Sequence, residues 1–274
     1  MKLTKSQIIS FQQKIFGWWS TPRRDLPWRH THDPYRIMVS EVMLQQTQVL
    51  RVTAKYAEFI EVFPTVFDLA KASPAQVLRI WKGMGYNRRA LYLQRAAKII
   101  VEEYHGKFPV SESELVKLPG LGTYTARAIL VFAYKEEVPL VETNVRQIIT
   151  HFFFKDELQK ESVVEEVAKQ LIPSGKSWEW HQAIMDYGAI ELQKVNGKRK
   201  KVKTKQVPFR ESNRFYRGRI IDRLREGDVS KKIFIRELVK KYDKPASFFQ
   251  SILKGLAADG LITTTKTGII SLPK

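Results

Sequence analysis

The stretch Leu118-Pro119-Gly120-Leu121-Gly122 indicates the fold of this chain more clearly than any other segment. Its two glycines allow the backbone to turn tightly and allow another surface to come close. Apolar residues continue at helical spacing on both sides of the turn, at Leu115, Leu118, Leu121, Ala126, Ile129 and Leu130. This shared apolar face predicts a packed hairpin of two helices rather than an isolated turn.

The ends of the two predicted helices indicate what the hairpin can bind. Ser111 and Glu114 form a capping-box pattern for the first helix, and Thr123 is the expected N-cap of the second. The first N–H groups of the second helix then point outward, and a helix N-terminus binds phosphate. The residues expected to contact a phosphate backbone are Leu118, Gly120, Gly122 and Thr123.

Helical periodicity dominates the chain up to about residue 194. One helix is expected through Ile8 to Trp19, and another begins with Asp33 as N-cap and Pro34 in its first turn. Ser73 and Pro74 make a similar start. Further helices are expected around 50–61, 74–82, 87–104, 112–117, 123–134, 143–153, 161–171 and 177–193. No strand-rich region stands out in this part, so the fold class is mainly α.

The composition of the 274-residue chain limits which kinds of partner and cofactor it can bind. Its net charge of +19 indicates a polyanion as partner, with counterion release from phosphates as the driving force. The chain has no cysteine, which excludes disulfides, thiolate zinc sites and cysteine-held iron–sulfur clusters. No apolar run approaches the roughly 20 residues of a membrane span. The first residues lack a signal-peptide pattern, so we expect an intracellular protein without membrane contact.

The composition changes after Gln193. Residues 194–212 are expected to form a basic linker without a periodic apolar face. Residues 213–274 then carry three helical patterns and a hairpin pattern from Leu261 to Leu272, which together are similar to a winged helix. Such modules bind DNA or dock on proteins, and both roles stay open here.

Four segments occur in a characteristic order: Leu26-Pro27-Trp28-Arg29, Ser40-Glu41-Val42-Met43-Leu44-Gln45-Gln46-Thr47-Gln48, Gly83-Met84-Gly85-Tyr86 and Leu118 to Thr125. In this order they resemble the A/G-specific adenine DNA glycosylases (the MutY type) of the endonuclease III superfamily. The similarity covers residues 5–193. It implies a helix-hairpin-helix glycosylase domain at 1–193, with a six-helix module at 24–134 and a second helical subdomain formed by 1–23 and 135–193.

Glu41 is the expected general acid. Its helical neighbours are Ile37, Met38, Leu44 and Gln45, and an apolar setting raises the pKa of a carboxyl group. An exposed Glu on the polar side of the helix is the alternative from the residues alone. By the resemblance, Glu41 matches the residue that protonates adenine.

The second carboxylate departs from the family, which has an aspartate where this chain has Glu142. The extra methylene matters because a displacement of about 1 Å can cost on the order of 100-fold in rate. Asn144 matches a family residue that orients the catalytic groups. Tyr124 stands where bifunctional relatives carry a lysine nucleophile, and a phenol cannot form a Schiff base. We therefore expect a glycosylase without strong lyase activity, although Tyr124 can also be a packing residue.

The resemblance assigns further site residues. Gln46 matches a wedge that enters the duplex, Met84 a second intercalating position, and Tyr86 a residue near the opposite base. Met84 can equally be a core residue. The positions that match the pocket for the flipped adenine are Leu26, Arg29 and Gln182.

Two features of the family have no counterpart here: the four cysteines that follow the segment matching 183–191, and the C-terminal domain that reads 8-oxoguanine. Trp178, Trp180 and Tyr187 are expected to supply packing where the cluster would be. The family's hairpins also bind sodium or potassium through backbone carbonyls. Here those carbonyls belong to Val116, Leu118 and Leu121.

The first hypothesis is thus a monofunctional, mismatch-specific glycosylase that removes adenine opposite 8-oxoguanine or guanine after base flipping. A thymine or uracil glycosylase acting opposite guanine, and a non-catalytic damage-binding protein, are the alternatives. We expect a monomer that acts on double-stranded DNA, is located in the cytoplasm and associates with the nucleoid.

Overall fold

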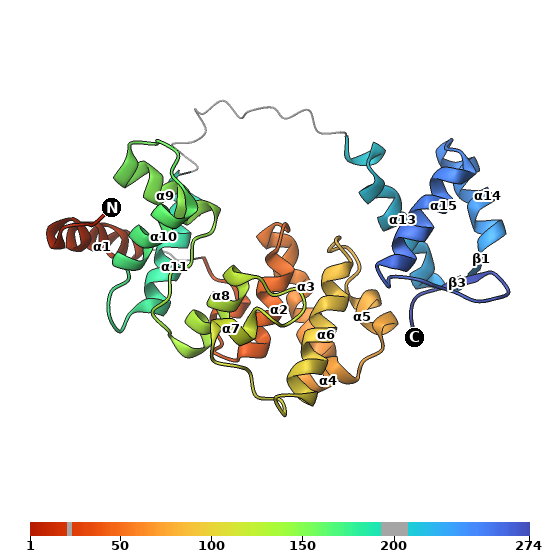
Figure 1. Ribbon diagram of the computed structural model, residues 1–274, viewed down its shortest axis with the longest axis horizontal. Coiled ribbons are helices and arrows are strands. Elements are labelled where there is room, and N and C mark those ends of the chain that lie inside the picture. Colours follow the sequence, from red (N-terminus) through yellow and green to blue (C-terminus); the bar gives the residue numbers. More distant parts are fainter. Residues whose placement is uncertain (21–23, 193–207) are drawn as a thin grey trace. The chain divides into compact units, whose positions relative to one another are not determined.

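The structure is a computed structural model that describes residues 1–20, 24–192 and 208–274. It confirms the mainly α fold class (Figure 1). The α-helices up to residue 192 are α1 (Lys5–Trp19), α2 (Pro34–Leu44), α3 (Val49–Val62), α4 (Val66–Lys71), α5 (Pro74–Ile80), α6 (Arg88–Glu102), α7 (Glu112–Leu115), α8 (Thr123–Tyr134), α9 (Thr143–Phe154), α10 (Glu161–Gln170) and α11 (Ser177–Tyr187). Short helical turns lie at Pro27–Arg29 (η1), Gly188–Leu192 (η2) and Phe209–Glu211 (η3).

The chain divides into two compact units. Unit 1 contains Met1–Glu41 and Phe108–Val202, and unit 2 contains Val42–Lys107 and Lys203–Lys274. The chain passes from unit 1 to unit 2 inside α2, and the subdomain boundaries expected from the sequence stay a prediction. The expected linker at 194–212 lies outside the described residues up to 207.

The core of unit 1 is formed by α1, α9, α10 and α11. Trp180 is buried and meets the rings of Phe11 and Phe16 edge to face, at 6.0 and 5.7 Å. Tyr187 packs against Trp18 at 5.2 Å. The packing role expected for the aromatic residues of this helix is therefore confirmed for Trp180 and Tyr187.

A buried ionic cluster joins α11 to the segment after α1. Asp186 is fully buried, and its carboxylate accepts hydrogen bonds from Arg29 Nη1 and Nη2 at 2.8 and 2.7 Å and from Arg24 Nε at 2.6 Å. The indole of Trp19 donates a further bond at 3.2 Å. Burial by itself would raise the pKa of Asp186, but the hydrogen bonds and charges of Arg29 and Arg24 outweigh it and lower the pKa.

The hairpin predicted around Gly120 is confirmed, because α7 and α8 pack side by side (Figure 1). Two of the expected caps are wrong in detail. Gly122, not Thr123, is the N-cap of α8, and Thr123 is its first helical residue. Ser111 precedes α7 but makes no capping bond to the backbone, because its hydroxyl donates to the Glu114 carboxylate at 3.0 Å.

The end of α11 also differs from the expected continuous helix over 177–193. The α-helix stops at Tyr187, and residues Gly188–Leu192 continue as a wider helical turn. A Cβ at Gly188 would lie 2.6 Å from the Cβ of Asn144, so the absent side chain lets the start of α9 approach this turn. The capping box of Ser73 with Pro74 in the first turn is confirmed.

Residues 208–274, the C-terminal module, form the expected winged-helix arrangement. Helices α13 (Asn213–Glu226), α14 (Lys231–Tyr242) and α15 (Ala246–Ala258) pack with a small antiparallel sheet of strand order β1-β3-β2 (Figure 1). The predicted hairpin is β2 (Thr263–Thr264) with β3 (Ile269–Ser271), and β1 (Val229–Ser230) adds a strand that its short, polar sequence did not reveal.

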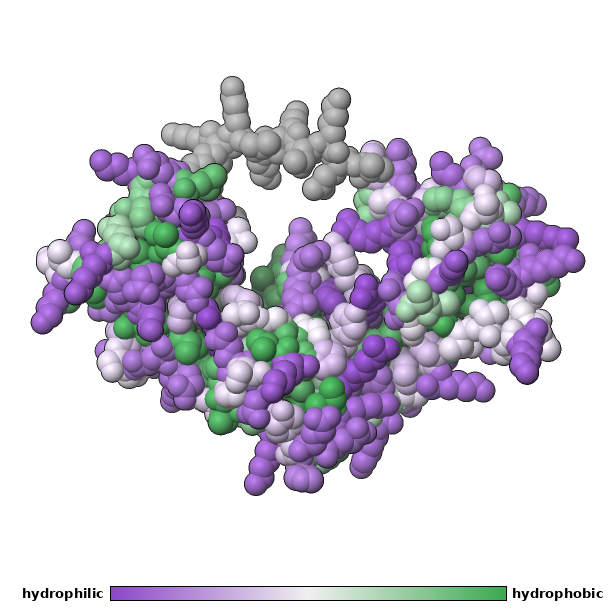
Figure 2. Space-filling model, viewed as in Figure 1, coloured by the Kyte–Doolittle hydropathy of each residue, from purple (hydrophilic) through white to green (hydrophobic). Residues whose placement is uncertain are grey.

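Hydrophilic side chains cover most of the face seen in Figure 2, in keeping with the high net charge. Among the described residues, no helix is both long and apolar enough to cross a membrane.

The ionic cluster predicts a large loss of stability in Asp186→Asn. Removing one partner of a buried ion pair leaves two guanidinium groups uncompensated, so we expect the free energy of unfolding to fall by about 3 kcal/mol at pH 7. Urea denaturation measures this difference. The matched control Asp68→Asn alters a half-buried residue of the α4 capping box, where asparagine can still accept from the Thr65 N–H, and should cost less than about 1 kcal/mol. Equal losses in the two variants would contradict a special role for the cluster.

Candidate active site

Glu41 lies in α2 and is buried, with 7% of its surface exposed. Burial, followed by the negative charge of Glu142, raises the pKa of its carboxyl group from 4.5 to about 7. The buried setting expected from its apolar helical neighbours is therefore confirmed, and an exposed position is excluded. A carboxyl group with this pKa holds a proton near neutral pH and can transfer it.

Tyr124 is the second residue of α8, directly after the hairpin. Burial first, and then the charges of Glu41 and Glu142, raise the pKa of its phenol well above 10. These mutual effects show that three segments distant in sequence bring Glu41, Tyr124 and Glu142 into one electrostatic site. The Tyr124 hydroxyl therefore keeps its proton across the physiological range and is available as a hydrogen-bond donor.

Glu142 is partly buried at the N-terminus of α9, where it is the N-cap. Its Oε1 accepts a hydrogen bond from the backbone N–H of Val145 at 3.1 Å. The positive end of the helix dipole favours a negative charge at this place. The longer side chain thus has a structural role in the same helix turn that carries Asn144.

The backbone before Glu142 is held by His181. This side chain is 2% exposed; its Nε2 accepts from the Leu140 N–H at 3.2 Å, and Nδ1 donates to the Ser177 carbonyl at 2.7 Å. Burial lowers the pKa of His181 to about 4, so the ring is neutral and keeps the lone pair that Leu140 requires. His181 therefore positions the segment that leads to Glu142.

The hairpin turn has the geometry of a backbone contact surface. Gly120 has φ of 81°, in the left-handed region that favours glycine. Gly122 is exposed, and a Cβ placed on it would meet no protein atom within 4 Å. Packing within the protein therefore does not require a glycine at 122, whereas a partner surface that approaches the backbone closely would.

The expected cation ligands stay a prediction. The Leu118 carbonyl accepts a hydrogen bond from the Leu121 N–H at 3.2 Å and, like any carbonyl, has a second lone pair for an ion. Among the described residues, no group of three or more His, Asp or Glu side chains could hold a metal ion.

Arg89 organises the loops that carry Gln46 and Tyr86. Its guanidinium is buried and donates to the carbonyls of Val42, Met43, Gln45, Met84 and Gly85 and to the Thr47 hydroxyl, at 2.6 to 3.3 Å. Burial lowers the pKa of Arg89 to about 10, so the group remains charged at neutral pH. Several of these acceptors lie at the end of α2, where a helix favours a cation.

This network presents two strained residues at the surface of unit 2. Gln46 and Tyr86 have φ of 54° and 44°, and both side chains are exposed. Met84, in contrast, is 2% exposed. The structure thus places Met84 in the interior, the alternative that the sequence left open, and its intercalation stays a prediction that requires the side chain to move.

The residues expected around the flipped base are buried parts of unit 1. Leu26 and Gln182 are 8% and 5% exposed, and Arg29 binds Asp186. Gln182 lies one helical turn before Asp186 on α11, so the two side chains share a face. Their contact with a base stays a prediction.

Sequence reasoning missed Asp186, His181 and Arg89. Asp186 follows the apolar run Ala183-Ile184-Met185, which was a usable signal, whereas His181 and Arg89 stand beside other polar residues and gave none. Their partners could not be read from the sequence, because those partners lie between 40 and 170 residues away or are backbone carbonyls.

Taken together, the geometry defines a helical protein in which a hairpin leads directly into a site that contains two carboxyl groups, one of them with a raised pKa. The chain matches the family described as HhH-GPD superfamily base excision DNA repair protein over residues 39–174. The chain belongs to this family.

Three relatives illustrate the similarity. An adenine DNA glycosylase of Mycolicibacterium smegmatis is 41% identical over 179 residues, which are 64% of this chain and 61% of that protein. A thymine/uracil-DNA glycosylase of Methanothermobacter thermautotrophicus is 30% identical over 184 residues, 66% of this chain and 83% of that protein. The solved structure of a thermostable thymine-DNA glycosylase has a TM-score of 0.64 at 30% identity and covers 69% of this chain and 89% of its own.

The chain spans 45 to 61% of the length of the adenine DNA glycosylases from Mycolicibacterium, Mycobacterium and Buchnera that it matches. The similarity therefore concerns the part of those proteins that corresponds to the hairpin and the carboxyl groups.

The raised pKa of Glu41 predicts that Glu41→Gln stabilises the fold at alkaline pH. The favourable contribution of protonated Glu41 is complete below pH 4.5 and is lost as the pH rises through 7, at a cost of about 3 kcal/mol. Glutamine is neutral at every pH, so the variant should match the parent at pH 4 and exceed its free energy of unfolding by about 3 kcal/mol at pH 8.

Chemical denaturation at both pH values measures this difference. His181 also titrates near pH 4, but it does so in the parent and in the variant alike, so its effect cancels in the difference between their free energies of unfolding. Glu58→Gln, at an exposed position, is the control and should show no such gap. A gap of the same size at pH 4 and pH 8 would show that folding does not shift the pKa of Glu41.

Arg89→Lys should lower the free energy of unfolding by about 3 kcal/mol, because one ammonium group cannot serve acceptors in two loops. Faster amide exchange in residues 45–47 and 83–86 should accompany the loss. The neighbouring Arg88→Lys, at an exposed position, is the matched control and should change stability little. Unchanged exchange in the Arg89 variant would contradict its organising role.

Proposed function

We propose that the protein is a monofunctional DNA glycosylase that removes adenine mispaired with 8-oxoguanine or guanine. The observation that carries the proposal is the buried Glu41 carboxyl group. Its burial and the neighbouring charge of Glu142 raise its pKa to about 7. The names of relatives at 34 to 41% identity support adenine as the base.

The proposed reaction divides the work between two carboxyl groups. Glu41 donates its proton to a ring nitrogen of the flipped adenine, which makes the base a better leaving group. As the bond between the base and the sugar breaks, the sugar gains positive charge, and the Glu142 carboxylate stabilises it until water adds. The proton lost by that water restores the protonated Glu41 for the next cycle.

Tyr124 supports the absence of strong lyase activity. Strand cleavage by a lyase requires an amine that forms a Schiff base with the sugar, and the Tyr124 phenol cannot supply one. Its hydroxyl instead lies in the field of Glu41 and Glu142, where it can donate a hydrogen bond to a carboxylate.

The hairpin supports double-stranded DNA as the substrate. The exposed N-terminus of α8 favours phosphate, and the open space above Gly122 allows a close approach of the backbone. The net charge of +19 supports the same partner.

Removal of thymine or uracil opposite guanine is the second candidate. The thymine/uracil-DNA glycosylase relative favours it, because the matched region covers 83% of that protein. Single-turnover excision from duplexes with A opposite 8-oxoguanine, A opposite G, T opposite G and U opposite G separates the two candidates.

We expect the fastest excision from adenine opposite 8-oxoguanine. Glu41→Gln should reduce the rate by about 100- to 10,000-fold, the range of a general acid, while duplex binding persists. Glu58→Gln is the exposed control and should retain the parent rate. Full activity of Glu41→Gln would refute the assignment of the acid.

Glu142→Asp tests the second carboxylate in the same assay. Aspartate is a preferred N-cap and can keep the bond to the Val145 N–H, so the fold should be retained. A parent that binds the duplexes but excises no base, together with an active Glu142→Asp variant, would favour a non-catalytic binding protein instead.

A further inference from the structure

The C-terminal module contributes to a pocket of about 1140 Å³ within unit 2. The pocket, here called the arginine pocket, is lined by residues 83–89 and by parts of α13 and α15. Seven arginines and two aspartates line it, which leaves a formal excess of five positive charges. Such a surface attracts an extended anion rather than an apolar ligand.

The two sides of the pocket are joined by a buried arginine. The Arg225 side chain is 6% exposed, donates to the Leu78 carbonyl at 2.9 Å and to Asn87 Oδ1 at 3.1 Å, and pairs with Asp222. Leu78 belongs to the last turn of α5, where the helix dipole favours a cation. Through Arg225 the C-terminal module is therefore held against α5 and Asn87, and the two sides of the pocket are connected.

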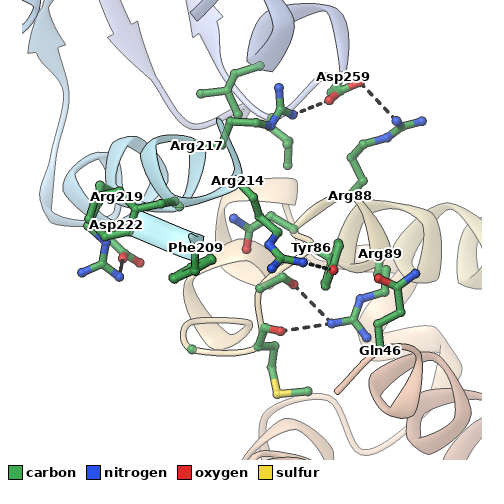
Figure 3. Close-up of a pocket in the computed structure, with 18 of the residues that line it drawn as sticks. Gln46, Tyr86, Arg88, Arg89, Phe209, Arg214, Arg217, Arg219, Asp222 and Asp259 are labelled. Atoms are coloured by element: carbon green, nitrogen blue, oxygen red, sulfur yellow. Dashed lines mark hydrogen bonds and ion pairs between the residues drawn. The ribbon is translucent and has the colours of Figure 1, made fainter. Parts of the chain in front are cut away.

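A second connection crosses the pocket mouth. Asp259, which follows α15, pairs with Arg217 of α13 and with Arg88 of α6 (Figure 3). A guanidinium has five N–H donors, so a single shared carboxylate leaves donors on both arginines for another anion.

Tyr86 lies at the centre of this surface. Its ring is held between the guanidinium groups of Arg89 at 5.5 Å and Arg214 at 5.1 Å, and Arg214 also donates to the Tyr86 hydroxyl (Figure 3). Arg214 lies over the ring of Phe209 as well, at 5.2 Å. Alternating arginine and aromatic groups are a typical surface for nucleic acid strands, where phosphates meet cations and bases meet rings.

One buried donor in the pocket lacks an acceptor. Arg89 lines the pocket, and its Nε has no hydrogen-bond partner within the part of the chain that the structure describes. Because this atom has almost no solvent-exposed surface, a bound anion would meet the other arginines of the pocket rather than this donor.

We propose that the arginine pocket binds the sugar–phosphate backbone of the DNA strand that faces Gln46 and Tyr86. Arg214 and Arg217 of the C-terminal module donate to phosphate oxygens, and Arg88 donates from the opposite side. The module is then part of the DNA-binding surface and not a protein-docking module. DNA as the ligand rests on the proposed function, whereas the binding site itself rests on the pocket.

The test measures duplex affinity by fluorescence anisotropy at several salt concentrations with the full chain. All variants carry Glu41→Gln, so that no excision disturbs the equilibrium. The double variant Arg214→Ala/Arg217→Ala should bind about tenfold more weakly at 0.1 M salt. The slope of log affinity against log salt should fall by about 1.8, because two phosphate contacts are lost.

The matched control is Arg236→Ala/Lys240→Ala, which removes two exposed cations from α14 of the same module. It should reduce affinity by less than about threefold and leave the slope nearly unchanged. Arg214→Ala alone leaves the Arg217–Asp259 pair intact, so it keeps the test valid if the double variant is unstable. Its slope should fall by about 0.9.

Affinity and slope equal to the control would overturn the proposal and favour a protein-docking module. A second contrary result is that inorganic phosphate protects the pocket arginines from chemical modification by phenylglyoxal, while the variants leave duplex binding unchanged. That result would indicate a small-anion site and would also overturn the proposal. Failure of the parent to excise any base would leave these binding results unaffected, so the two proposals fail separately.

Discussion

The buried carboxyl group at Glu41 is the constraint that the packing of unit 1 has to accommodate. Taking a carboxylate out of water is costly, so the group holds its proton to a pKa of about 7. The carboxyl group stays buried because the buried apolar residues of α2, α8 and α9 hold these helices in place around it. His181 holds the backbone before Glu142, and Gly188 allows α9 to approach the turn after α11. The stability lost at Glu41 is typical of a site arranged for proton transfer.

Two buried arginines, Arg89 and Arg225, hold separate segments of unit 2 together by donating hydrogen bonds to both. Arg89 satisfies carbonyls at the end of α2 and in the 83–86 turn, so one charged group orders both exposed loops. Arg225 does the same between α5 and the C-terminal module. In each case one guanidinium serves several acceptors at once, because its five N–H donors point in fixed, separate directions. The high arginine content of unit 2 therefore has a structural as well as an electrostatic role.

The sequence predicted the hairpin, most helices and the winged-helix module, because these depend on local spacing and turn residues. The predictions from the sequence were wrong where the local pattern allowed more than one backbone conformation. Thr123 and Gly122 are both acceptable N-caps, and the backbone conformation selected the glycine. Residues 188–192 continue the α11 pattern as a wider turn, and Gly188 there packs closely against Asn144, a contact that lies outside the local pattern. Strand β1 was missed because two residues carry no periodic signal.

By itself, the sequence determined the helical class, the absence of cysteine ligands, the cationic character and the positions of Glu41, Tyr124 and Glu142. These are properties of residue type and near-neighbour spacing. The tertiary structure alone decided that the three side chains share one electrostatic site, that Arg29 binds Asp186 and that α13 shares a pocket with Tyr86. The physical reason is that burial and charge pairing join residues such as Glu41 and Tyr124, or Arg29 and Asp186, which lie more than 80 residues apart. Local patterns contain no information on which of these segments meet.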